Sequence, residues 1–399
     1  MDFLPAFPPA LSHAALFGVL VVLGLVAGEV VRRYARVPRI TGYVIAGAAL
    51  GPQGGAVLSG DMLFDLRLLV DLSIGLILFE LGYRFDFGWL RRNRWLFATA
   101  IAESLFCFFA IFMALTAFGF RPLLAAMAAA VGTATSPAVV LLVAHEQRAE
   151  GQVTERTLLF TAVNTAFAYV LLTLLLPFLH MEYAASWRQT VFHPLYILAG
   201  STLGGYLACA LLMLLARWLG KSEERQFVLL VAMVVVTVGV AHALKLSVSL
   251  TLLTLGILAR NLDSAHALLP PRFGHGAQLF FVILFVMVGA SLEFRAFGAA
   301  AAGAVAAFLL VRFAAKSAVV MMFGPLSGMR PASSALIAVA LLPLSGSAVV
   351  MVRETTTLYP EFGRELAAVV LSAVVILELL GPLATQFALR RAGEAHPGA

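Results

Sequence analysis

Apolar stretches of about 20 residues recur along the whole chain, and this feature constrains the fold more than any other. A helix of that length just crosses the hydrocarbon core of a bilayer, which is about 30 Å thick. Hydrophobic residues make up 61% of the 399 residues and charged residues only 12%. An average soluble protein is about 25% charged. The sequence therefore predicts an all-α polytopic membrane protein.

About thirteen membrane spans are predicted from these stretches. With alternating connections, 18 basic residues fall on one side of the membrane and 7 on the other. Basic residues are enriched in cytoplasmic connections. The prediction is therefore an integral protein of a bacterial inner (plasma) membrane, with its N-terminus outside and its C-terminus in the cytoplasm. The predicted spans are 11–31, 38–52, 66–84, 94–118, 122–144, 156–180, 193–218, 225–243, 245–262, 276–292, 297–323, 332–352 and 365–390.

A weak internal repeat relates the two halves of the chain at an offset of about 207 residues, because LFELGYRFDF (78–87) aligns with FVMVGASLEF (285–294). The matched pairs are Gly82 with Gly289, Asp86 with Glu293, Phe87 with Phe294 and, at nearly the same offset, Pro137 with Pro343. This offset covers seven spans, so the halves should cross the membrane in opposite directions, as the inverted repeats of secondary transporters do. The predicted organisation is a first repeat (1–192), a linker span (193–224) and a second repeat (225–399), with no soluble regulatory domain.

Two predicted spans are interrupted near their centres, the fifth by TATSPAVV (133–140) and the twelfth by LLPLSGSAVV (341–350). Proline removes a helical N–H and clashes with the carbonyl four residues earlier. Backbone groups freed at mid-membrane must face protein or water, so the two breaks are expected to meet and form an ion site. The alternative is a packing kink at each proline. Breaks are expected at Pro137, Pro343 and Gly346, with the hydroxyls of Thr133, Thr135, Ser136, Ser345 and Ser347 around them.

Two basic side chains lie inside the eleventh span, where Lys316 is central and Arg312 is one turn earlier on the same face. A basic group at this depth is costly unless it is paired or hydrated. Lysine, unlike arginine, can release its proton, so Lys316 is a candidate proton-exchanging group. The alternative is that both side chains extend towards the membrane surface or pair with a structural carboxylate. The candidate charge partners are Arg312, Glu103 and Glu80, while Glu378 in the last span is interpreted as structural or as an oligomer contact.

An ordered set of motifs resembles the monovalent cation:proton antiporters of the Kef and NapA type, which are sodium/hydrogen exchanger-like proteins. The motifs are VPRITGYVIAGAALGP (37–52), LLVDLSIGLILFELGYRFDF (68–87), TATSPAVV, LTLLTLGILARN (250–261), LFFVILFVMVGASLEF (279–294), RFAAKSAVV (312–320) and LLPLSGSAVV. The resemblance implies inverted repeats, two crossed and unwound helices, an elevator-like movement of a core domain, and a homodimer.

The sixth span departs from that family at its most informative position. By the resemblance, TAVNTAFAYV should carry an Asn-Asp or Asp-Asp pair whose aspartate alternately binds the cation and the proton. Asn164 matches the first position, but Thr165 stands where the aspartate should be. Lys316 matches the basic residue that faces this aspartate, so it is expected to lack its carboxylate partner and to release its proton readily.

Three functional hypotheses follow. In the first, the chain exchanges a monovalent cation, Na⁺ or K⁺, for protons by alternating access, with Lys316 as the proton-linked group and a cation site at Asn164, Thr165, Thr133, Ser136 and backbone carbonyls. In the second, it is an uncoupled pathway or carries another solute, such as an anion attracted by Lys316. In the third, it is a non-transporting membrane scaffold or sensor.

Several function classes have no support in the sequence. Neither a G-x-G-x-x-G fingerprint nor a Walker loop occurs, and the two cysteines do not form a metal-spaced cluster. We therefore expect no enzymatic activity, no cofactor, no metal beyond a transported monovalent cation, and no nucleotide or nucleic-acid partner. The expected partners are monovalent cations, protons, the lipid bilayer and a second copy of the chain.

Overall fold

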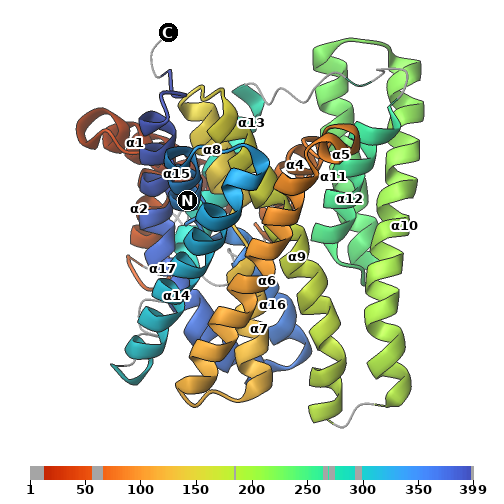
Figure 1. The fold of residues 1–399 in the computed structure, drawn as a ribbon. Helices are drawn as coiled ribbons and strands as arrows, with labels where there is room; N and C mark the ends of the chain where they lie inside the picture. The colour runs from red at the N-terminus through yellow and green to blue at the C-terminus, as the bar shows by residue number, and fades with distance from the viewer. Residues whose placement is uncertain are drawn as a thin grey trace, which may run out of the picture.

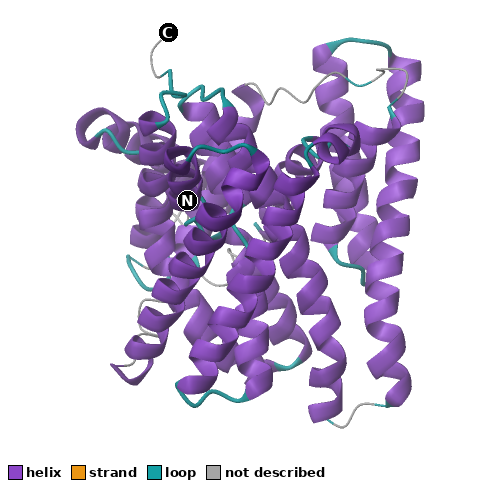
Figure 2. Ribbon diagram, viewed as in Figure 1, coloured by secondary structure: helices purple, strands orange, loops and turns teal. Residues whose placement is uncertain are grey.

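The computed structural model describes residues 13–55, 66–183, 186–263, 268, 275–292 and 299–396, and the fold in this part of the chain is helical (Figures 1 and 2). The first series of helices is α1 (His13–Val30) with its π-helical extension η1 (Val31–Ala35), α2 (Arg39–Leu50), α4 (Arg67–Tyr83), α5 (Phe87–Arg92), α6 (Arg94–Ala117), α7 (Pro122–Thr133), α8 (Pro137–Glu146) and α9 (Gln152–Glu182). After α10 (Trp187–Leu219), the second series is α11 (Glu223–Ala243), α12 (Val248–Leu262), α13 (His275–Ala290), α14 (Ala299–Phe323), the 3₁₀ turn η3 (Gly324–Ser327), α15 (Pro331–Ala340), α16 (Gly346–Leu358) and α17 (Pro360–Arg391).

Every predicted span coincides with a helix or, in the fifth and twelfth spans, with a pair of helices. Within the described residues, 8 segments are long and apolar enough to cross a membrane. Shorter apolar helices, among them α2 and α12, lie between them. The prediction of an all-α polytopic membrane protein is confirmed.

Helices of the first series pack against helices of the second, since α2 packs against α13 and α4 packs against α12. Glycines permit both crossings. A Cβ on Gly289 of α13 would lie 2.2 Å from the carbonyl oxygen of Val44 in α2, and one on Gly82 of α4 would lie 2.5 Å from that of Leu253 in α12. The aligned glycines therefore play the same part in each half. The division at residues 192 and 224 stays a prediction. The aligned Glu293 and Phe294 lie outside the described residues.

Both expected breaks are present, but the proline alignment was wrong in detail. Pro137 is the first residue of α8, where proline is well tolerated because that N–H has no helical partner. Pro343 instead lies inside the longer break between Ala340 and Gly346. The structurally equivalent residues are the two N-caps, Ser136 before α8 and Ser345 before α16. Pro343 lies two residues before the N-cap of α16, so it does not start that helix.

Candidate functional site

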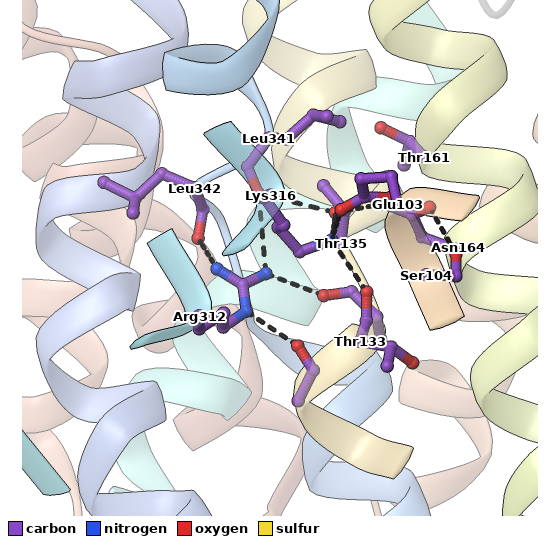
Figure 3. A network of polar contacts seen from close by, with 12 residues as sticks. Glu103, Ser104, Thr133, Thr135, Thr161, Asn164, Arg312, Lys316, Leu341 and Leu342 are labelled. Carbon is purple, nitrogen blue, oxygen red and sulfur yellow. Dashed lines mark hydrogen bonds and ion pairs between the residues drawn. The ribbon is translucent and has the colours of Figure 1, made fainter. Parts of the chain in front are cut away.

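The two breaks touch each other in the buried centre of the molecule (Figure 3). The backbone N–H of Ser136 donates to the carbonyl of Pro343 at 3.0 Å. The hydroxyl of Thr135 donates to the carbonyl of Leu341 at 3.4 Å. Freed backbone groups of one break are thus partly satisfied by the other, which is the solution that a low-dielectric interior requires. The expectation that the breaks meet is correct.

Arg312 of α14 joins the two breaks through their carbonyl oxygens rather than through a carboxylate (Figure 3). Its donor–acceptor distances are 2.8 Å to Gly132, 2.7 Å to Ala134, 2.7 Å to Leu342, 3.3 Å to Pro343 and 3.4 Å to Leu341. These carbonyls lie at the C-terminal ends of α7 and α15, where the helix dipoles concentrate negative charge. The guanidinium therefore compensates both helix ends while its side chain is only 1% exposed. Its role in the described structure is to hold the breaks together.

Lys316, one turn further along α14, forms a buried ion pair with Glu103 of α6. Lys316 Nζ lies 2.6 Å from Glu103 Oε1, and the side chains are 1% and 0% exposed. The ammonium also donates to the carbonyl of Thr133 at 2.9 Å and to the Thr135 hydroxyl at 3.4 Å. The expectation that Lys316 lacks a carboxylate partner was wrong, because α6 supplies one that the sequence had left only as a candidate. The second oxygen of Glu103 is buried and has no hydrogen-bond partner among the described residues.

The polar pair of α9 lies against the same break. The Asn164 amide donates to the Thr135 hydroxyl at 3.1 Å and its oxygen accepts from Ser104 at 2.9 Å. Thr165 donates to the carbonyl of Thr135 at 3.0 Å and to that of Thr161, one turn earlier, at 2.7 Å. Ser104 was not predicted from the sequence, although it directly follows Glu103 inside an apolar run.

Some of the remaining predicted residues lie at the breaks, and others lie elsewhere in the molecule. Thr133 donates to the carbonyl of Ala130 within its own helix, and the Ser136 hydroxyl caps α8. Glu80 does not pair with Lys316: it pairs with Arg84 and with His145, each at 3.1 Å. Ser345 donates to Glu378 at 3.0 Å, and the Ser347 hydroxyl is buried with no described partner. The structure thus gathers Lys316, Glu103, Asn164, Thr165, Thr133 and Thr135 in one network of polar contacts, whereas Ser345 contacts Glu378 instead.

A cavity of about 1120 Å³ approaches the breaks from one end of the molecule. Its lining combines charged side chains, such as Asp71, Lys245 and Arg353, with apolar side chains of α9, α13 and α16. The cavity reaches Gly346, the first residue of α16. A water-accessible route therefore leads from one surface to the edge of the second break.

Comparison with known proteins decides the family. The family model for the sodium/hydrogen exchanger, transmembrane, matches residues 18–391. The chain belongs to the sodium/hydrogen exchanger family. Two structures of the sodium proton antiporter MjNhaP1 from Methanocaldococcus jannaschii share the fold. One, determined at pH 8, has 13% identity and a TM-score of 0.66 over 95% of each chain. The other, from electron microscopy, has 16% identity and a TM-score of 0.69 over 97% of this chain and 100% of that one. No curated protein matches the sequence.

Family membership fixes the general role of this exchanger-family protein. It is an integral membrane protein of a cation:proton antiporter family, a transporter and not an enzyme. In the part of the chain that the structure describes, no three His, Cys, Asp or Glu residues form a group that could hold a metal ion.

Proposed function

We propose that the protein is a secondary transporter that exchanges a monovalent cation, Na⁺ or K⁺, for a proton by alternating access. The observation that carries this proposal is the buried Lys316–Glu103 pair beside the contact between the two broken helices. Its Nζ and Oε1 atoms are 2.6 Å apart. Buried ionisable residues in a membrane domain are costly and are generally retained for ion movement. Broken helices at mid-depth supply the backbone oxygens that coordinate cations in secondary transporters.

The exchange follows from charge balance at this pair. With Lys316 protonated, the pair is neutral and the ammonium donates to Glu103 Oε1 and to the carbonyl of Thr133. A monovalent cation that takes the place of the ammonium gains the same two oxygens, and Lys316 then gives up one proton. The site carries the same net charge before and after. Thr135, Asn164 and Thr165, which form hydrogen bonds beside it, are the proposed neutral ligands or positioning groups.

Alternating access is supported by the difference between the two ends of the molecule. The cavity enters from the end that carries Lys245 and Arg353. At the other end, Glu80 of α4 pairs with His145 of α8, and Arg84 of α4 pairs with Glu155 of α9. These contacts link α4 to α8 and α9 at that end. We therefore propose that the structure corresponds to an outward-facing state, with the N-terminus outside and the C-terminus in the cytoplasm of a bacterial inner membrane. A homodimer is part of this proposal.

Ion flux in proteoliposomes tests the function. Imposed Na⁺ or K⁺ gradients should drive proton movement in the wild type, and Lys316→Ala and Glu103→Gln should each abolish it. Arg217→Lys, an exposed change on α10, is the control. A wild type that moves no protons with any monovalent cation would contradict the proposal. Movement of an anion in that assay would favour the other-solute hypothesis, and the absence of all flux would favour the scaffold hypothesis.

A further inference from the structure

Glu378 of α17 is a fully buried carboxyl group that contacts the second break and not Lys316, and from its sequence context it was expected to be structural or an oligomer contact. Its side chain is 0% exposed within a single chain, so a partner subunit does not reach it. Oε1 accepts a hydrogen bond of 3.0 Å from Ser345, the N-cap residue of α16. Oε2 has no described hydrogen-bond partner.

No described cationic side chain neutralises this carboxyl group. On the neighbouring helix α14, Arg312 is bound to break carbonyls and Lys316 to Glu103. On α16, Arg353 and Glu354 lie about two turns from Ser345. On the other helices that contact α17, the charged or titratable side chains are Arg39 and Tyr43 on α2 and His145 and Glu146 on α8, and Arg39 pairs with Glu29 and His145 with Glu80. On α17 itself they are Glu361, Arg364, Glu365, Arg390 and Arg391, all at least 12 residues from Glu378 and therefore more than three turns away. An ionised carboxylate buried without a counter-charge is strongly disfavoured. The group is therefore stable only with a proton or with a bound cation.

The position of Glu378 repeats, in the second half, the position of the Asn164–Thr165 pair in the first. α9 passes the first break, where its polar pair contacts Thr135. α17 passes the second break, where Glu378 contacts Ser345 and a Cβ on Gly381 would lie 2.8 Å from Cα of Pro343. The carboxyl group that is missing at residue 165 thus has a counterpart on the helix that occupies the equivalent place.

Groups around Glu378 suit a small cation. Ser347, in the first turn of α16, has a buried hydroxyl with no described partner, as does Oε2 of Glu378. Ser347 lies two residues after the N-cap Ser345, and Glu378 accepts the hydrogen bond of Ser345. The cavity reaches Gly346, between the two serines, where a Cβ added to the glycine would have its nearest neighbouring atom 3.8 Å away, so there is space beside the backbone. Gly346 lines the cavity, and the residue before it, Ser345, donates its hydroxyl to the carboxyl group.

We propose that Glu378, with Ser345 and Ser347, forms a second cation- and proton-binding site, loaded from the cavity. In one state the carboxyl group is protonated. In the other, its O–H bond has broken, the proton has left through the cavity, and a monovalent cation is held by the carboxylate and the serine hydroxyls. The site is neutral in both states. The inference rests on the proposed antiport and adds a second exchanging group to the Lys316–Glu103 pair.

Proton release on cation binding tests this inference. Purified protein in weakly buffered detergent solution is mixed with NaCl or KCl, and the protons released per chain are measured. The wild type should release about one proton more per chain than Glu378→Gln, because glutamine has the shape of the protonated acid but cannot ionise. Glu365→Gln, an exposed change on the same helix, should release as many protons as the wild type. Equal release from wild type and Glu378→Gln would overturn the inference.

Two further readouts separate this inference from the proposed function and from misfolding. Release of no protons by the wild type would contradict the antiport itself, whereas release retained in full by Glu378→Gln would contradict only the second site. If Glu378→Gln does not fold, infrared difference spectra of the wild type decide. Addition of NaCl or KCl should remove a protonated-carboxyl band, and a spectrum without that loss for either salt would overturn the inference.

Discussion

Lys316 and Glu103 form an ion pair of 2.6 Å between α14 and α6, with both side chains excluded from solvent. Removal of one partner from a buried pair leaves an uncompensated charge and costs about 3–5 kcal/mol, whereas replacement of both by apolar groups is often neutral. Lys316→Met and Glu103→Met should therefore each lower the melting temperature in detergent. The double variant should be more stable than either single variant, and none of the three should carry out exchange. A double variant whose loss of stability equals the sum of the two single losses would show that the pair is not coupled.

Arg312 should be more sensitive to conservative substitution than a surface arginine. Its planar guanidinium donates to carbonyls of both breaks, and an ammonium on a lysine stem cannot match this set of acceptors. Each buried carbonyl left unpaired costs ~1–3 kcal/mol. Arg312→Lys should lower the melting temperature strongly and abolish exchange. The matched control is Arg217→Lys on α10, which should change neither property. Retained exchange in Arg312→Lys would show that the breaks hold together without the guanidinium group.

Much of the fold was predictable because it depends on local hydrophobicity. Runs of apolar residues located the spans, and proline, glycine and serine located both breaks, since each acts on the turn in which it lies. The site was less predictable, because its partners are distant in sequence: Glu103 and Lys316 are 213 residues apart. Glu378 shows the same limit. Its neighbours in sequence are apolar, and only the packing of α17 on the second break places it beside Ser345.

The ion pairs at the end opposite the cavity should favour the outward-facing state. His145 Nε2 lies 3.1 Å from Glu80 Oε1, and this contact joins α8 to α4. A hydrogen bond or an ion pair of this kind contributes about 1 kcal/mol, so its loss should shift the conformational equilibrium roughly 5-fold. In His145→Ala, a cysteine introduced at Val350, in the cavity lining, should react more slowly with an impermeant thiol reagent. The native Cys107 and Cys209 are buried. Unchanged or faster labelling would contradict this role. Glu155→Gln removes the exposed partner of Arg84 at the same end of the molecule and serves as a comparison variant.

Asp86 should make the stability of the protein depend on acidic pH. The backbone N–H of Trp89, at 2.9 Å, and then the guanidinium of Arg260 hold the pKa of Asp86 below its usual value. A lowered pKa means that its stabilisation is complete above the unfolded-state value of about 3.9 and is lost as the pH falls through the lower folded-state value. Asp86→Ala, which removes the N-cap of α5, should cost about 1 kcal/mol at pH 7. Melting temperatures of wild type and variant should converge below about pH 4. A constant difference at all pH values would contradict this account.

Glu394 should stabilise the start of α9 from the segment that follows α17. Its two carboxylate oxygens accept from the backbone N–H groups of Val153 and Thr154, each at 2.8 Å, and its own carbonyl accepts from Glu150 at 3.0 Å. These are free donors at a helix N-terminus, where a negative charge is favourable. Glu394→Ala should therefore cost about 1 kcal/mol and accelerate hydrogen exchange at the first turn of α9.

The effect of Glu394→Ala should remain local to that end of the helix. Asn164 lies 12 residues, about 18 Å, beyond the first residue of α9, so its amide exchange should not change if the rest of the helix stays intact. Glu394→Gln, which keeps one acceptor oxygen but not the charge, should fall between wild type and alanine. Hydrogen–deuterium exchange of the three proteins measures this directly. Acceleration that extends to Asn164 would mean that this contact holds the whole of α9 against the first break, and not its first turn alone.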